Sequence, residues 1–138
     1  MSEPGYILQP IGRVESPLRL SDDVPKQGDE GAPDAWLVFE EAMADGLRDV
    51  KVGDDLLVLT WLDRASRDVL TVHPRGDRSR PATGVFSTRS PHRPNPLGLH
   101  RVGVLAIDGL RIRVRDLEAV DGTPIVDVKP PLGPVEER

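Results

Sequence analysis

An alternating run, LRIRVR at residues 110–115, is the feature that most constrains the fold of this chain. Its apolar residues alternate with arginines, a period of two that predicts a β-strand with one buried side and one side facing solvent. The apolar run 103–107 precedes it, and Asp108-Gly109 between them is a preferred two-residue hairpin turn because both positions tolerate positive φ. We therefore predict an antiparallel hairpin. Its arginines are expected to face solvent, with binding of an anionic ligand as the alternative: Arg111, Arg113 and Arg115.

The rest of the chain consists of short β-type runs with little helix. Residues rich in β-forming side chains predict further strands at 5–12, 35–40, 56–62, 67–73 and 124–128. Residues 40–49 predict one short helix, and Asp121-Gly122 predicts a turn. Residues 17–34, rich in Asp, Gly and Pro, predict a loop of a length that is uncommon unless it is functional or disordered. About seven or eight short strands favour a mainly β fold, as a small barrel or a sandwich.

Length and composition set broad limits. A chain of 138 residues fits one domain, 1–138. Because there is no cysteine, disulfides, thiolate metal sites and cysteine nucleophiles are excluded. The first residues lack the basic start and apolar core of a secretion signal, and no apolar run approaches the ~18 residues that a membrane span needs. We expect a cytoplasmic protein that does not interact with membranes.

Charge is distributed unevenly along the chain. The net charge is −5, yet residues 64–101 contain eight arginines and only two acids, whereas residues 1–55 contain five basic and thirteen acidic residues. A basic patch of this kind can attract phosphate or carboxylate even on an acidic protein. Mutual neutralisation of the two regions in the folded chain is the alternative.

The motifs of several common enzyme classes are absent. The sequence has no GxGxxG or GxxxxGK[ST], which argues against dinucleotide and P-loop phosphate sites in their usual form. It has no GxSxG nucleophile elbow and no HExxH. The histidines His73, His92 and His100 show no metal-ligand spacing with acids, so no metal site is expected.

The loop TRSPHRPNPLG, residues 88–98, is the first of two polar clusters. Its prolines fix φ and so reduce the freedom that the loop would lose on binding a ligand. Arginine presents a planar fork that suits carboxylate or phosphate. Asn95 precedes a proline, so its backbone is biased to extended geometry and its amide can face a ligand. A rigid surface turn with arginines paired to carboxylates is the alternative.

The second cluster is LEAVDGTPIVDVKPPLG, residues 117–133. Glu118, Asp121 and Asp127 lie on or beside a tight turn, and Lys129 precedes two prolines. Turn chemistry alone accounts for an Asp-Gly pair followed by Thr-Pro. The residues by themselves leave both interpretations open.

Together the two clusters closely resemble the paired signatures of the TsaA-like, or TrmO-like, family of tRNA threonylcarbamoyladenosine methyltransferases. The resemblance rests on GVFSTRSPHRPNPLGL (84–99) and LEAVDGTPIVDVKP (117–130). Weaker matches occur at QPIGRVESP (9–17), VPKQG (24–28) and LLVLTWLDR (56–64), so the resemblance covers roughly residues 7–133.

This resemblance implies a small, mainly β barrel that binds S-adenosylmethionine without a Rossmann fold, as a homodimer with the cofactor near the subunit interface. It implies methylation of N6 of threonylcarbamoyladenosine beside the tRNA anticodon. The cofactor-binding residues implied by the motifs are Pro25, Lys26, Gln27, Asp63, Arg64, Arg89, Leu99, Leu117, Glu118, Ala119, Val120 and Asp121. As substrate-binding residues we expect His92, Arg93, Asn95 and Lys129.

Methyl transfer relies largely on holding the methyl donor and the acceptor at the right distance. The base that removes a proton is expected to be Asp63 or Asp121.

The chain departs from the family pattern at three positions. Family members often have Arg in place of Lys26, His in place of Asp63 and Tyr in place of Pro131. The chain also ends at residue 138, whereas many bacterial members continue into a second domain. Two rival functions therefore stay open: methylation of a small molecule or another nucleoside, and a non-catalytic module that binds S-adenosylmethionine.

Overall fold

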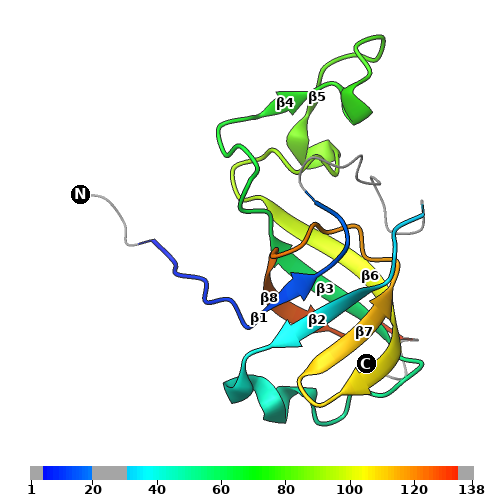
Figure 1. Ribbon diagram of the computed structural model, residues 1–138. Coiled ribbons are helices and arrows are strands. Elements are labelled where there is room, and N and C mark those ends of the chain that lie inside the picture. The colour runs from blue at the N-terminus through cyan, green and yellow to red at the C-terminus, as the bar shows by residue number, and fades with distance from the viewer. Residues whose placement is uncertain (1–4, 20–30, 134–138) are drawn as a thin grey trace.

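Six antiparallel strands form a closed barrel in the computed structural model, which describes residues 5–19 and 31–133 (Figure 1). The barrel strands are β1 (Gly12–Glu15), β2 (Ala35–Phe39), β3 (Asp55–Trp61), β6 (Leu97–Asp108), β7 (Arg111–Arg115) and β8 (Pro124–Lys129). Their order around the barrel is β1-β2-β7-β6-β3-β8, and pairing of β1 with β8 closes it.

A small two-stranded ribbon stands apart from the barrel. Its strands are β4 (Thr71–Val72) and β5 (Thr83–Gly84), which pair antiparallel. In Figure 1 this ribbon projects from one end of the barrel. Three short 3₁₀ helices complete the described elements: η2 (Glu41–Leu47), η3 (Pro74–Gly76) and η4 (Val85–Ser87).

The core lies inside the barrel and follows from strand alternation. Every second residue of β2 and β3 is buried, as is every second residue of the first part of β6. Aliphatic side chains dominate this interior, among them Val14, Leu37, Val58, Ile112 and Ile125. Leu117 and Ala119, in the connection from β7 to β8, join the same cluster. Burial of this apolar surface is the main force that holds the barrel together.

The mainly β fold predicted from the sequence is confirmed, and it is a closed barrel rather than a sandwich. The predicted short helix is also confirmed and corresponds to η2.

The predicted start of the first strand is wrong. The strand begins at Gly12 instead of residue 5, and residues 5–11 lie outside the sheet. Pro10 has no N–H to donate to a ladder, and the first bond to β8 comes from the Ile11 N–H, 2.8 Å from the Ile125 carbonyl oxygen.

Two other predictions need local correction. The strand expected at 67–73 is reduced to Thr71–Val72. The hairpin turn consists of Gly109 and Leu110, because Asp108 pairs with Arg111. A β-bulge between Val104 and Ala106 shifts the register of β6 against β7, and a bulge adds a residue to one strand.

The arginines of β7 face solvent, as expected, and each contacts a carboxylate. Arg111 lies 3.0 Å from Glu15 and Arg113 lies 2.8 Å from Asp34, nitrogen to oxygen. Acids of the N-terminal region therefore neutralise the charge of these two arginines of β7.

No helix among the described residues is long and apolar enough to cross a bilayer.

Candidate functional site

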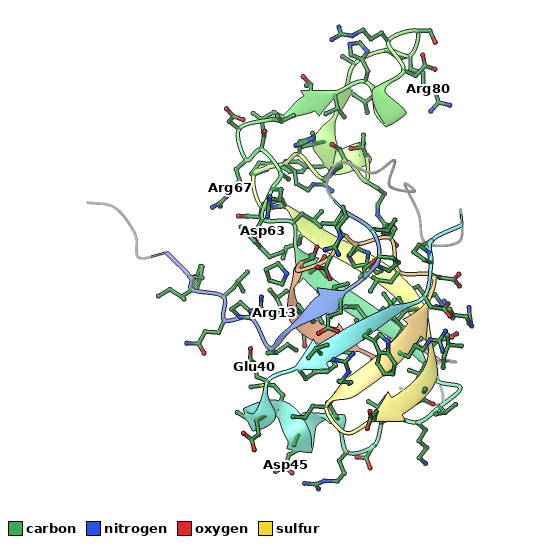
Figure 2. All side chains as sticks on the ribbon, in the orientation of Figure 1. Arg13, Glu40, Asp45, Asp63, Arg67 and Arg80 are labelled. Carbon is green, nitrogen blue, oxygen red and sulfur yellow. The ribbon has the colours of Figure 1, made fainter. Side chains whose placement is uncertain are left out.

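A pocket of about 530 Å³ opens at the end of the barrel where β3 ends and β6 begins. Its volume lies in the usual range for small-molecule sites. Four segments and Thr123 line it: residues 62–65 after β3, residues 89–93, residues 97–100 of β6, and residues 118–120. Figure 2 shows Asp63 and Arg67 between the barrel and the ribbon, with Arg80 at the ribbon's tip.

The loop at residues 88–96 is held in place partly by its own arginine. The half-buried Arg93 guanidinium donates hydrogen bonds to the carbonyl oxygens of Val85 and of Thr88, the latter at 3.0 Å. Its backbone N–H donates to the Ser66 carbonyl oxygen at 3.1 Å. Arg93 therefore fixes the shape of the loop, in addition to the restriction that the prolines impose on φ.

A second set of contacts ties this loop to the segment after β3. Arg67 donates from Nε to the Pro94 carbonyl oxygen at 2.7 Å and from its terminal nitrogen to Asn95 Oδ1 at 2.9 Å. The guanidinium of Arg67 also lies 5.2 Å from the ring centre of Trp61, a cation–π contact. The Ser66 N–H donates to His92 Nδ1 at 3.0 Å, so this nitrogen carries no proton. Both walls of the pocket are thus linked by direct hydrogen bonds.

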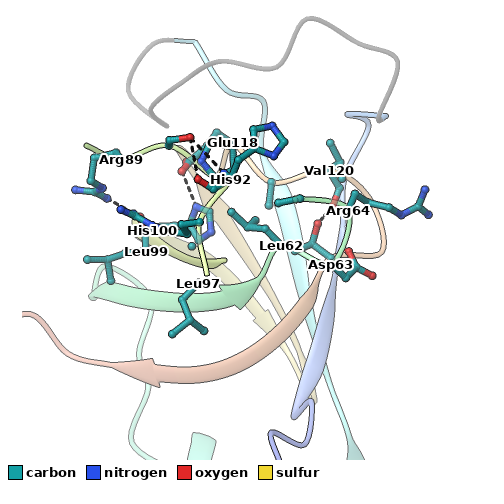
Figure 3. A pocket seen from close by; sticks show the side chains of 17 residues that line it. Leu62, Asp63, Arg64, Arg89, His92, Leu97, Leu99, His100, Glu118 and Val120 are labelled. Carbon is teal, nitrogen blue, oxygen red and sulfur yellow. Dashed lines mark hydrogen bonds and ion pairs between the residues drawn. The ribbon is translucent and has the colours of Figure 1, made fainter. Parts of the chain in front are cut away.

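Arg89 remains largely available at the pocket rim. Its side chain is exposed, and one terminal nitrogen donates to the Leu99 carbonyl oxygen at 3.0 Å. A guanidinium has five N–H donors, so this single bond anchors Arg89 while leaving donors for an anion. Figure 3 places Arg89 on one side of the pocket and Asp63 and Arg64 on the other.

A buried polar triad lies between these two sides. His100 Nδ1 is 2.6 Å from Glu118 Oε1, and His100 Nε2 is 2.7 Å from Thr60 Oγ1. The side chains of His100 and Glu118 are only 4% and 15% exposed. A carboxylate accepts, so Nδ1 carries the proton, and the Thr60 hydroxyl can donate to or accept from Nε2. The triad therefore holds Glu118 in one orientation at the pocket wall.

Gly98 makes room for this triad. It pairs with Thr60 across β3 and β6, and a Cβ at Gly98 would press against Thr60 Oγ1 and lie 2.7 Å from His100 Nε2. The glycine in the proline-rich motif therefore has a steric purpose here, because any larger residue would displace a buried hydrogen bond.

The structure brings most of the predicted site residues to the pocket, from segments far apart in the sequence. Those that line it are Asp63, Arg64, Arg89, His92, Arg93, Leu99, Glu118, Ala119 and Val120. Pro25, Lys26 and Gln27 lie outside the described residues.

Four predicted residues are not among those that line the pocket. Leu117 is fully buried in the core, and Asn95 accepts the hydrogen bond from Arg67. Lys129 Nζ contacts Asp127 at 3.2 Å at the end of β8. Asp121 accepts from the Ser16 N–H at 3.0 Å and from Arg19 at 2.8 Å, so it ties the turn before β8 to the segment after β1. The predicted roles of these residues stay predictions.

Sequence reasoning missed Thr60, Leu62, Leu97 and His100. His100 could have been noticed in the sequence, because it occupies an inward position of a strand, where an ionisable side chain needs a buried partner.

Among residues 5–19 and 31–133, no group of three or more His, Cys, Asp or Glu side chains is placed to hold a metal ion.

Comparison with known proteins relates the chain to methyltransferases and S-adenosylmethionine-binding proteins. An "S-adenosyl-L-methionine-binding protein" of Archaeoglobus fulgidus is 43% identical over 123 residues, which are 89% of this chain and 87% of that protein. A "probable S-adenosyl-L-methionine-binding protein" of Methanothermobacter thermautotrophicus is 40% identical over 94% of this chain and 93% of its own length.

Solved structures share the fold. Two crystal structures of TrmO from Pseudomonas aeruginosa superpose with a TM-score of 0.74 at 22% and 24% identity, over 99% and 94% of this chain. The chain spans only 61% and 57% of their lengths. The family model described as "tRNA-methyltransferase O N-terminal domain" matches residues 13–135. The chain therefore belongs to the family of the tRNA-methyltransferase O N-terminal domain.

Proposed function

We propose that this protein binds S-adenosylmethionine in the pocket at the end of the barrel and transfers its methyl group to tRNA, at N6 of threonylcarbamoyladenosine beside the anticodon. The family model carries the name of a tRNA methyltransferase, and relatives that are 43% and 40% identical are named as S-adenosylmethionine-binding proteins. Because tRNA is the proposed acceptor, the proposed location is the cytoplasm.

The observation that carries this proposal is the mixture of chemical groups in one pocket. S-adenosylmethionine has a carboxylate, an ammonium group, ribose hydroxyls and a flat adenine, and the pocket offers a matching group for each. Arg89 provides a cation at one side, Asp63 and Glu118 provide acids, and an apolar wall lies between them. The apolar wall includes Leu62, Leu97, Leu99 and Val120.

The residues have separate tasks in this proposal. The free donors of Arg89 bind a carboxylate, for which the guanidinium fork is well shaped. Glu118, held by His100, accepts hydrogen bonds from ammonium or hydroxyl groups, and the triad keeps this acceptor oriented before the ligand arrives. Preorganisation of this kind reduces the entropy lost on binding. When bound, S-adenosylmethionine supplies a methyl group activated by its positively charged sulfur.

Asp63 is the proposed base. Its exposed carboxylate lines the pocket and has no side-chain hydrogen bond or ion pair within the described part of the chain. It is therefore free to take a proton from the acceptor nitrogen. The carboxylate of Asp121 is engaged by Ser16 and Arg19, which makes it the weaker candidate.

A homodimer is part of the proposal. Two outward-facing cross-strand pairs, Leu59 with Leu99 and Trp61 with Leu97, form an apolar patch on β3 and β6. Leu97 and Leu99 are 42% and 44% exposed, and both also line the pocket. A second copy covering this patch would bring the cofactor close to the subunit interface.

The test is nucleoside mass spectrometry of tRNA from cells with and without the gene. We expect the N6-methylated threonylcarbamoyladenosine to disappear in the deletion strain and to return with the wild-type gene, but not with an Asp63→Asn variant. An unchanged nucleoside profile would contradict the proposed activity. If the protein then still binds S-adenosylmethionine, the binding-module function, which the names of the relatives favour, replaces it.

A further inference from the structure

The arginines of residues 62–96, between β3 and β6, have different hydrogen-bond and ion-pair partners from the arginines of β6 and β7. On β6 and β7 each arginine contacts a carboxylate, and Arg101 and Arg115, for example, both reach Asp55. Among the described side chains of residues 62–96, Arg80 is the arginine with such a contact, at 3.7 Å from Asp77. Among the described side chains, Glu15, Asp34 and Asp55 of the N-terminal region pair with arginines of β6 and β7, and no acid of that region pairs with an arginine of residues 62–96.

The hydrogen bonds that these arginines make do not neutralise their positive charge. Arg67, Arg89 and Arg93 donate to carbonyl or amide oxygens, which carry no net charge. Residues 62–96 contain seven arginines, three aspartates, and no lysine or glutamate, in a chain whose net charge is −5. This segment is therefore a local region of excess positive charge on an acidic protein.

The β4–β5 ribbon, residues 68–86, carries part of this charge away from the barrel. Figure 2 shows Arg67 at its base and Arg80 at its far tip. The tip is shaped by local hydrogen bonds: His73 Nδ1 lies 2.9 Å from the Arg80 carbonyl oxygen, and the Ser79 hydroxyl donates to Asp77 at 2.6 Å. The hydrogen bonds from Ser79 lower the pKa of Asp77, so this acid stays charged and offsets part of the arginine charge at the tip.

Exposed apolar side chains accompany the arginines. Phe86 is 81% exposed and Leu70 is 62% exposed, both on the ribbon. An exposed aromatic ring on the same segment as exposed arginines is a combination that binds single-stranded nucleic acid, through base stacking and phosphate contacts. An acidic peptide would satisfy the arginines but would leave the aromatic ring without a comparable partner.

We infer that the β4–β5 ribbon is a docking surface for the phosphate backbone of the RNA whose base enters the pocket. The ribbon lies close to the pocket along the chain, because residues 62–65 and 89–93, which line the pocket, flank the ribbon on either side in the sequence. An RNA strand leaving the pocket toward the ribbon therefore meets a segment with excess positive charge. This inference rests on the proposed function, since it takes tRNA as the substrate.

The experiment compares three double variants in their binding to unfractionated tRNA, measured by fluorescence anisotropy at several salt concentrations. Arg78→Gln with Arg80→Gln removes two charges at the tip. Arg48→Gln with Arg113→Gln is the matched control, because it removes two exposed, ion-paired arginines outside the ribbon. Arg78→Lys with Arg80→Lys keeps the charge.

We expect the tip Gln variant to bind tRNA several-fold more weakly and to lower the slope of log affinity against log salt by about one for each lost phosphate contact. The control and the Lys variant should bind like the wild type. Affinity for S-adenosylmethionine, measured by calorimetry, should be equal in all four proteins, which also shows that each is folded.

Failure of this inference is distinguishable from failure of the proposed function. If the tip Gln variant binds tRNA as well as the wild type, or if the control loses as much affinity, the ribbon is not the docking surface, although methyl transfer to tRNA still stands. If the wild type neither binds nor methylates tRNA but binds S-adenosylmethionine, both the docking surface and the tRNA substrate are wrong.

Discussion

At the scale of single residues, Thr60, His100 and Gly98 form a closely packed, buried contact at the site. A histidine with both ring nitrogens satisfied in the barrel interior has no room to shift, because protein interiors are close-packed. The pocket wall that includes Glu118 depends on this arrangement.

Gly98→Ala should therefore destabilise the protein. The new methyl group would overlap Thr60 Oγ1 and crowd His100, and overpacking of this kind costs about 1–3 kcal/mol. Urea unfolding measures the loss, and S-adenosylmethionine affinity should fall as well because the triad is displaced. Gly46→Ala is the control, since a Cβ there meets nothing within 4 Å. Equal stability of the two variants would show that the crowding is relieved without cost.

At the scale of elements, the proline-rich loop is held by hydrogen bonds that its sequence does not reveal. The sequence indicated stiffness from the prolines and an arginine fork facing a ligand. In the structure Arg93 points back to the carbonyl oxygens of Val85 and Thr88, and Arg67, which the sequence did not single out, fastens Asn95. Stiffness was predictable from local chemistry, whereas these partners depend on tertiary packing.

Arg93→Gln tests whether this arginine is structural or contacts the substrate. Loss of a charged donor to half-buried carbonyl groups should cost about 1–3 kcal/mol, seen as a lower urea midpoint and faster amide exchange in residues 85–96. Arg113→Gln is the control, because its exposed ion pair with Asp34 should contribute at most about 1 kcal/mol. Full stability combined with lost tRNA binding would instead support the substrate contact predicted from the sequence.

At the scale of the whole molecule, the sequence predicted the fold class well and the assembly of the site only in part. Alternation of apolar residues marks the strands of a barrel, and the two motifs mark the segments that meet at its end. The burial of His100 had a signal in the sequence, but its hydrogen-bond partner Thr60 could not be predicted, because it depends on the register that sets Thr60 opposite Gly98. The contacts of Asp121 with Ser16 and Arg19 join residues about a hundred positions apart, which local patterns do not encode.

The proposed homodimer belongs to this scale as well. Leu59→Glu places a charge in the apolar patch on β3 and β6 without changing a residue that lines the pocket. We expect the wild type to be a dimer by light scattering and this variant to be a monomer, because burying an unpaired carboxylate at an interface is costly. Leu105→Glu, on β6 but outside the patch and 39% exposed in the wild type, should leave the dimer intact. A monomeric wild type would contradict the assembly.

The central claim is that this pocket binds S-adenosylmethionine, and calorimetric titration with the cofactor tests it most directly. The wild type should bind, and Arg89→Ala should bind at least about tenfold more weakly, since an arginine–carboxylate bond of about 1.5–3 kcal/mol is lost. Its urea midpoint should stay close to that of the wild type, because the Arg89 side chain is exposed. Arg113→Ala, which lies outside the pocket, should bind normally. Equal affinity of Arg89→Ala and the wild type, or no binding by the wild type, would contradict the account.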